Sequence, residues 1–264
     1  MKEVIKKSVL RINSWVFIAL FCLVSSVASA QITVVSYMKV EPGQWDTYLE
    51  VEEAWSKLHQ KSIDNGYMLE WRLHEKMFHG SDDEYDFITV NVYADWATYE
   101  KGFPDGYFDQ MGEDIMTKTG VSRKMVRQEA YSMAVGAENS KPAKIITLAL
   151  MKVEQGNNSA FVDMEAKYYK VYHEALIEAG GLNSWAIYSR VMPYGYGGDY
   201  NYVAVNGFES LAQRGSLAEE AYDTAWENAA AGTSDDDMNK ITNDSRVIVR
   251  TEMWRNLMSV SASK

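Results

Sequence analysis

The feature that most constrains the fold of this chain is an internal repeat. Residues 37–43 (YMKVEPG) return as residues 150–156 (LMKVEQG), and residues 85–91 (YDFITVN) return as residues 200–206 (YNYVAVN). Residues 58–71 match 172–185, and residues 122–129 match 245–252, in the same order. Four matches in order indicate a duplicated structural unit. The offset grows from 113 to 123 residues, which predicts small insertions in loops and around the second helix of the later copy.

Each copy has the same predicted order of elements. Alternating β-branched and aromatic residues at 32–40 and 145–153 predict the first strands. Apolar residues at steps of three and four predict the helices that follow, at 45–58 and 161–171, and Gly66 and Gly180 are suited to their C-terminal ends. Two strands, an acidic helical stretch and a last strand complete the order βαββαβ, the ferredoxin-like unit. We therefore predict an α+β fold with one unit at residues 31–137 and a second at residues 138–264.

One sheet face of such a unit has no helices and needs a cover, which the second copy can supply. The repeated element order, the glycine-terminated first helix and the Trp of the second strand (Trp71, Trp185) resemble the dimeric α+β barrel superfamily. That superfamily includes antibiotic-biosynthesis monooxygenases and NIPSNAP-type domains. The resemblance implies two tandem ferredoxin-like units packed sheet to sheet, as a pseudodimer within one chain. Residues 52–60 are also similar to a Glu-x-x-Trp-x-x-[Leu/Ile]-His-Gln helix of exported bacterial proteins.

The first 30 residues predict a secretory signal peptide. Basic residues between positions 2 and 11 precede an apolar stretch at 15–24, and residues 28–30 (ASA) form a small-x-small cleavage site. The apolar stretch is shorter than the roughly 18 to 20 residues that cross a bilayer. We expect cleavage after Ala30, no membrane anchor afterwards, and a periplasmic or secreted protein.

Cysteine content, charge and missing motifs narrow the function classes. The one cysteine, Cys22, lies in the signal, so the mature chain has no disulfide. The net charge of −11 becomes −14 when the signal removes four basic residues and one acidic residue. An acidic chain without a basic cluster lacks a surface for phosphate backbones, which excludes nucleic acid as a partner. The sequence lacks the dinucleotide, P-loop, nucleophile-elbow and zincin motifs, and we expect no cofactor and no metal.

Alternation along the strands predicts what lies between the two sheets. In the third strands, Ile88, Val90 and Val203 are expected under the helices, and the aromatic and polar positions between them toward the opposite sheet. In the last strands, Arg127 and Glu129 are expected to face inward, as are their matches in the second copy. The ligand-binding candidates are Arg127, Arg250, Asn91, Asn206, Trp71, Trp185, Tyr85 and Tyr200. The acid/base candidates are His59, His173, Glu129 and Glu252.

Each candidate type has two interpretations. The arginines and glutamates either pair with one another or present a charged fork and a proton acceptor to a ligand. The repeated histidines either transfer protons or pack at helix ends, and the strand tryptophans either pack or stack on a ligand. His74 and His79 have no counterpart in the second copy, and we expect both at the surface.

Three functions are compatible with this sequence. The first is an exported protein that binds a small organic molecule in a pocket between the two sheets. The second, implied by the resemblance, is a cofactor-independent monooxygenase-like enzyme that acts on a small aromatic substrate with His or Glu as its base. The third is an interaction module whose barrel is filled by side chains. A cavity between the sheets would separate the first two from the third.

Overall fold

The computed structural model describes residues 31–195 and 198–262. The predicted signal peptide lies outside the described residues. Within residues 31–264, which form one compact unit, the elements follow the predicted order twice. None of the described helices is long and apolar enough to span a membrane.

The two halves contain the same elements with different helical additions. The first half has β1 (Ile32–Val40), α2 (Trp45–Asp64), β2 (Glu70–Met77), β3 (Phe87–Tyr93), α3 (Trp96–Glu100), the 3-10 helix η1 (Phe108–Met111), α4 (Gly112–Ser122) and β4 (Arg123–Gly136). The second half has β5 (Ile145–Lys152), α5 (Asn158–Met164), the π-helix η2 (Glu165–Tyr169), α6 (Lys170–Glu178), β6 (Ser184–Met192), β7 (Tyr202–Phe208), the 3-10 helix η3 (Gln213–Gly215), α7 (Glu219–Ala229), α8 (Asp235–Ser245) and β8 (Val247–Ser261). The predicted boundary between residues 137 and 138 falls in the linker from β4 to β5.

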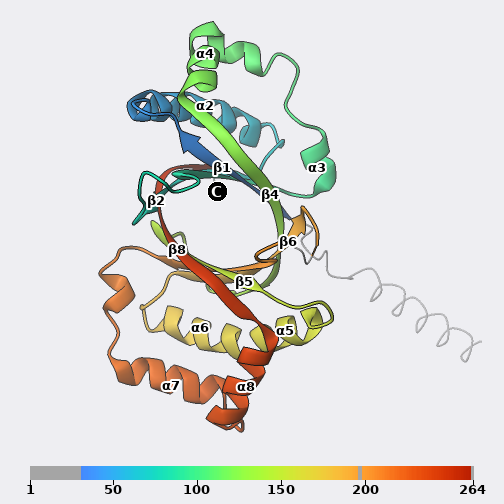
Figure 1. Ribbon diagram of the computed structural model, residues 1–264, viewed down its shortest axis with the longest axis vertical. Helices are drawn as coiled ribbons and strands as arrows, with labels where there is room; N and C mark the ends of the chain where they lie inside the picture. The colour runs from blue at the N-terminus through green and yellow to red at the C-terminus, as the bar shows by residue number, and fades with distance from the viewer. Residues whose placement is uncertain (1–30, 196–197, 263–264) are drawn as a thin grey trace, which may run out of the picture. The chain divides into compact units, whose positions relative to one another are not determined.

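The strands close into one barrel in the order β1-β3-β2-β8-β5-β7-β6-β4. The two halves meet where β2 pairs with β8 and where β4 pairs with β6, both antiparallel. In Figure 1, α2 and α4 lie on one side of the barrel and α5 to α8 lie on the other. The predicted fold, two ferredoxin-like units packed sheet to sheet in a single chain, is confirmed.

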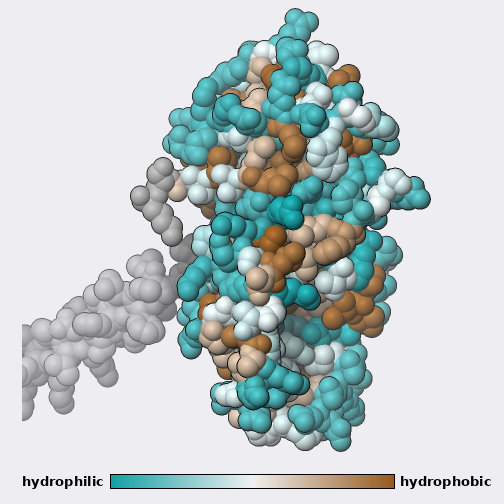
Figure 2. All heavy atoms as spheres, turned by 90° about the vertical axis from the view of Figure 1, so that its left-hand side faces the viewer, coloured by the Kyte–Doolittle hydropathy of each residue, from teal (hydrophilic) through white to brown (hydrophobic). Residues whose placement is uncertain are grey.

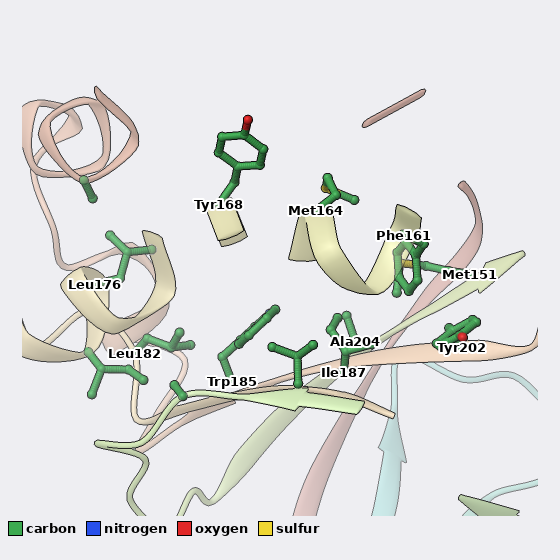
Figure 3. Close-up of a cluster of buried hydrophobic side chains, with 14 of the residues drawn as sticks. Met151, Phe161, Met164, Tyr168, Leu176, Leu182, Trp185, Ile187, Tyr202 and Ala204 are labelled. Carbon is green, nitrogen blue, oxygen red and sulfur yellow. The ribbon is translucent and has the colours of Figure 1, made fainter. Parts of the chain in front are cut away.

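The helices lie against the outer faces of the two sheets because each carries one apolar stripe. In α2, residues Tyr48, Val51, Trp55 and Leu58 are buried at steps of three and four. In the second half, Phe161 and other apolar residues of α5 pack onto the rings and aliphatic chains of β6 and β7 (Figure 3). Seen from the side where β2 and β8 meet, hydrophobic side chains gather at mid-height, between mostly hydrophilic helical layers (Figure 2).

The π-helix accounts for one of the predicted insertions. Glu52 matches Glu165 at an offset of 113 residues, whereas His59 matches His173 at an offset of 114. The extra residue falls in the Glu165–Tyr169 π-turn, so it widens one turn of the helix instead of lengthening a loop. The larger growth in offset lies between β7 and β8, around α7 and α8, as predicted.

The predicted orientation of β3 and β7 is wrong. Ile88 and Val203 face the barrel interior, whereas Phe87 and Tyr202 pack on the helix side. Alternation separates two sets of residues without saying which set faces the helices. The large rings fill the deep space under the helices, and the smaller aliphatic side chains line the interior.

Each helical layer packs one histidine against a strand tryptophan. The rings of His173 and Trp185 stack with centroids 4.7 Å apart, and those of His59 and Trp71 lie 5.2 Å apart. Burial lowers the pKa of both histidines to about 4. Both are therefore neutral at neutral pH.

We expect His173→Gln to weaken the acid sensitivity of the protein. His173 has a pKa of about 6.5 in the unfolded chain and about 4 in the folded chain. Between these pH values the unfolded chain binds a proton that the folded chain does not, so the free energy of unfolding decreases as the pH falls below 6.5. The free energy of unfolding, measured in urea at pH 7 and pH 5, should therefore fall by about 2 kcal/mol less in the variant than in the wild type. His79→Gln, at an exposed histidine, is the control. An unchanged difference between the two pH values in His173→Gln would contradict this account.

Candidate functional site

The barrel interior contains a cavity of about 620 Å³ between the two sheets. This volume lies within the range of small-molecule sites. Its aliphatic wall comes from both halves and consists of Val35, Ile88, Val90, Ile146, Leu148, Val203 and Val205. The barrel is therefore not filled by side chains, and the interpretation as a filled interaction module is wrong.

The two ends of the barrel differ. Neighbouring strands are antiparallel and four steps separate β1 from β5, so these two strands run in the same direction. At the end where they finish, which we call the polar end, charged and tyrosine side chains fill the interior. At the opposite end, the linker end, residues of the 137–144 linker border the cavity. The cavity extends from the middle of the barrel to the linker end.

One half of the polar end is centred on Glu129. Its Oε2 accepts hydrogen bonds from the hydroxyls of Tyr131 at 2.6 Å and Tyr200 at 2.7 Å, and its Oε1 accepts one from Arg190 at 3.1 Å. Burial alone would raise the pKa of Glu129, but these tyrosines and the charges of Arg127 and Arg190 lower it. Glu129 is thus a carboxylate held by several donors.

The other half of the polar end repeats this arrangement around Glu252. Its Oε1 accepts a hydrogen bond from Tyr85 at 2.8 Å and lies 3.0 Å from Nε of Arg250. Lys76, at 3.6 Å, takes the place that Arg190 has beside Glu129. Arg250 also donates to the Tyr85 hydroxyl at 2.6 Å.

The polar end thus brings together six of the predicted site residues. They are Arg127, Glu129, Tyr200, Tyr85, Arg250 and Glu252. Arg127 also pairs with Glu84 at 2.9 Å. In this structure the arginines and glutamates are partners of one another, and their role toward a ligand stays a prediction.

Asn91, Trp71 and His59 lie on the helix side of the first sheet, away from the polar end. They line a smaller pocket of about 180 Å³ under α2, together with the buried ion pair of Glu52 and Arg123. Trp71 and Asn91 are register partners, and so are Trp185 and Asn206 in the second half. Trp185 stacks on His173 and also borders the main cavity. The structure therefore separates these candidates from the arginines and glutamates.

His74 is a cavity residue that the sequence analysis placed wrongly at the surface. It is 1% exposed and lines the cavity from β2. Burial, with a smaller effect from Arg72, lowers its pKa to about 3. No histidine in the second copy matches His74, because the two copies have diverged at this position. Tyr188 occupies the matching position of β6 and lines the same cavity. Trp71 and Leu73 are large apolar residues suited to the helix side of the sheet. Because side chains alternate along a strand, His74 then belongs to the opposite face, which points into the barrel.

Asn256 faces the cavity beside His74. The two residues are register partners across the junction of β2 and β8. Within the part of the chain that the structure describes, the buried atoms Nδ1 of His74 and Oδ1 of Asn256 have no hydrogen-bond partner. The two charged residues that β2 contributes to the cavity wall form a bidentate ion pair. Nε and Nη2 of Arg72 donate to Oε1 and Oε2 of Glu70 at 2.7 and 2.5 Å.

The described residues contain no group of three or more His, Cys, Asp and Glu side chains that could hold a metal ion. The cavity walls are largely apolar and also carry an imidazole, an amide, tyrosine hydroxyls and the Glu70–Arg72 pair.

The sequence matches no protein-family model and no curated protein. Solved structures with a similar fold include two proposed monooxygenases, from Lactobacillus acidophilus and Fusobacterium nucleatum. The first is 11% identical with a TM-score of 0.53 and covers 88% of this chain and 96% of its own. The second is 10% identical with a TM-score of 0.55, over 89% and 96%. An anthrone oxidase-like protein is 9% identical with a TM-score of 0.50, over 91% and 97%. This likeness shows that the chain shares the dimeric α+β barrel fold.

Proposed function

We propose that the chain is a monooxygenase-like enzyme that needs no cofactor and holds a small aromatic substrate inside the barrel. The observation that carries the proposal is the cavity of about 620 Å³ with its aliphatic wall. A cavity of this size accommodates a ligand of roughly two to three fused rings. The fold shared with two proposed monooxygenases and an anthrone oxidase-like protein supports the choice of reaction class.

A reaction of this class converts a CH₂ group flanked by aromatic rings into a carbonyl. The CH₂ group loses both hydrogens; one atom of O₂ becomes the carbonyl oxygen, and the other leaves in water. The first proton passes to a base, and the carbanion supplies the electrons that reduce O₂. His74 is the imidazole in the cavity, and an anion forming beside it would raise its pKa by Coulomb attraction.

Binding without turnover is the second candidate. Burial lowers the pKa of His74 to about 3, and hydrogen bonds and cations lower the pKa of Glu129 despite its burial. Efficient general bases have pKa values near the working pH. Neither group meets that condition, which favours binding without turnover.

We also propose that the protein is exported. The sequence of residues 1–30 supports this. N-terminal sequencing of the protein from its own host should begin at Gln31. A protein that retains Met1 would contradict export by a cleaved signal.

A substitution that fills the cavity should abolish ligand capture. Ala186 lines the cavity from β6, and Phe at this position projects a ring into the space. Native mass spectrometry of the wild type from its own host should reveal a bound small molecule, and Ala186→Phe should lose it. Thr251→Phe places the same ring at an exposed position of β8 and should keep the molecule. The same bound molecule in Ala186→Phe would contradict a site in the barrel.

The reaction can be tested with anthrone as the probe. Wild-type protein should consume O₂ and release anthraquinone in equal amounts, and Ala186→Phe should reduce the rate at least about tenfold, because the substrate no longer fits. An oxygen electrode and chromatography of the product measure both quantities. Binding of anthrone without O₂ uptake above the uncatalysed rate would favour the second candidate. Equal rates in the wild type and Ala186→Phe would contradict the proposed active site.

A further inference from the structure

We propose that two copies of the mature chain associate through the free edge of β8, around a twofold axis close to Val249. The contact surface consists of Phe78 and residues 247–251, which together we call the edge patch. This inference goes beyond the proposed function and does not depend on it, because it concerns the outside of the barrel and names a second copy of this chain as the partner.

One edge of β8 is paired along only part of its length. On one side β8 pairs with β2 between residues 253 and 261, and on the other side it pairs with β5 between residues 247 and 255. Residues 247–252 therefore have a strand neighbour on the β5 side alone. No backbone hydrogen bond to their other edge is found among the residues that the structure describes. Such an edge presents N–H and C=O groups that can pair with another strand.

The free edge is apolar and exposed. All five residues from 247 to 251 are exposed, although they belong to a strand of the barrel. Val247, Ile248 and Val249 are 64%, 53% and 44% exposed. Phe78 directly follows the last residue of β2 that pairs with β8, and it is 83% exposed. Consecutive β-branched residues on an open edge are a template for a further strand.

The matching edge of the first copy carries a protecting residue. β4 pairs with β6 only from Ala130 onward, so residues 124–129 are also free on one side. Lys124 occupies the position that Val247 has in the second copy. Lysine on an edge strand opposes pairing with other chains, because its charge would have to leave water. The second copy has lost this protection.

The two edges differ in side chains and not in backbone form, since both contain a bulge, at Val126 in β4 and at Val249 in β8. Each chain thus has one apolar edge and one edge protected by a lysine. An apolar edge that pairs with its own copy is used up in the contact. We therefore expect a closed dimer and no filament.

A second copy fits the patch by symmetry, position and size. Antiparallel strands around a twofold axis bring the same apolar run of each chain together. The contact continues an interface of the fold itself, because the edge left free at residues 247–252 is the one that pairs with β2 further along. Phe78 and the three branched residues expose roughly 500 Å² per chain, so two chains supply roughly 1,000 Å², about the size at which specific interfaces begin.

The charge in the patch does not oppose the contact. Arg250 is its charged residue, and Nε of Arg250 lies 3.0 Å from Oε1 of Glu252. Its Nη2 atom donates to the hydroxyl of Tyr85 at 2.6 Å. Like charges facing each other across strands are destabilising. Here each arginine is already paired within its own chain.

Sedimentation velocity of the full-length mature protein tests the proposal. At about 100 µM the wild type should sediment with twice the mass of one chain, and Ile248→Lys should weaken the dimer at least about tenfold, because a lysine would be desolvated in the contact. Met125→Lys places the same residue at the matching exposed position of β4 and should leave the dimer intact. Circular dichroism checks that each variant is folded.

A single cysteine locates the axis. The sequence after residue 30 contains no cysteine, so Val249→Cys creates one thiol per chain. Two such thiols close to a twofold axis should form a disulfide under mild oxidation, because the Cβ atoms of a disulfide lie only about 3.8 Å apart. Met125→Cys, with a similarly exposed side chain on the other edge, should remain uncrosslinked.

Three results would each overturn the proposal: a wild type that stays monomeric at this concentration, a dimer that Ile248→Lys leaves intact, or equal crosslinking of Val249→Cys and Met125→Cys. The first and third decide the question even if Ile248→Lys does not fold. None of these results bears on the barrel cavity, which Ala186→Phe tests separately.

Discussion

The pairing of β2 with β8 and of β4 with β6 is the constraint on which the rest of this structure depends. Each half alone would have two unpaired sheet edges and one bare sheet face, both of which are costly in water. Joining the edges closes the barrel and encloses the bare faces, which creates the interior. Because the two sheets are held apart at their edges, their facing residues need not fill the space between them. The cavity is thus a direct consequence of how the halves are joined.

The two copies of the repeat contribute matching positions to the interior, and the residues at these positions are similar at one end of the barrel and different toward the other. At the polar end the two copies still match, since Glu129 and Glu252 each accept a hydrogen bond from a tyrosine hydroxyl and lie beside an arginine. These groups pair with one another at that end. Toward the linker end the matching positions differ, as His74 against Tyr188 shows. A symmetric scaffold has in this way acquired an asymmetric chamber, which is what recognition of an asymmetric small molecule requires.

Much of the fold could be predicted from the sequence, because the repeat and the βαββαβ order leave few ways to cover two bare sheets. The inward positions of Arg127 and Glu129 followed from the pattern of the last strand of the first copy and agree with the structure. The orientation of β3 could not be derived, because alternation is symmetric between faces and its rings were as compatible with the interior as its aliphatic residues. His74 was missed for a different reason: comparison of the copies favours residues that recur, whereas the chamber depends on residues that diverged. Register across the β2–β8 junction, which brings Asn256 beside it, is a tertiary property that no local pattern contains.

The central claim is that the barrel interior is an open, largely apolar chamber. Crystals of the mature protein pressurised with xenon test it directly, because xenon enters dry apolar cavities and scatters strongly. The account predicts xenon between the two sheets, in contact with Val35, Leu148 and Val203. An interior closed by repacked side chains, with xenon absent from it in otherwise well-ordered crystals, would contradict the account.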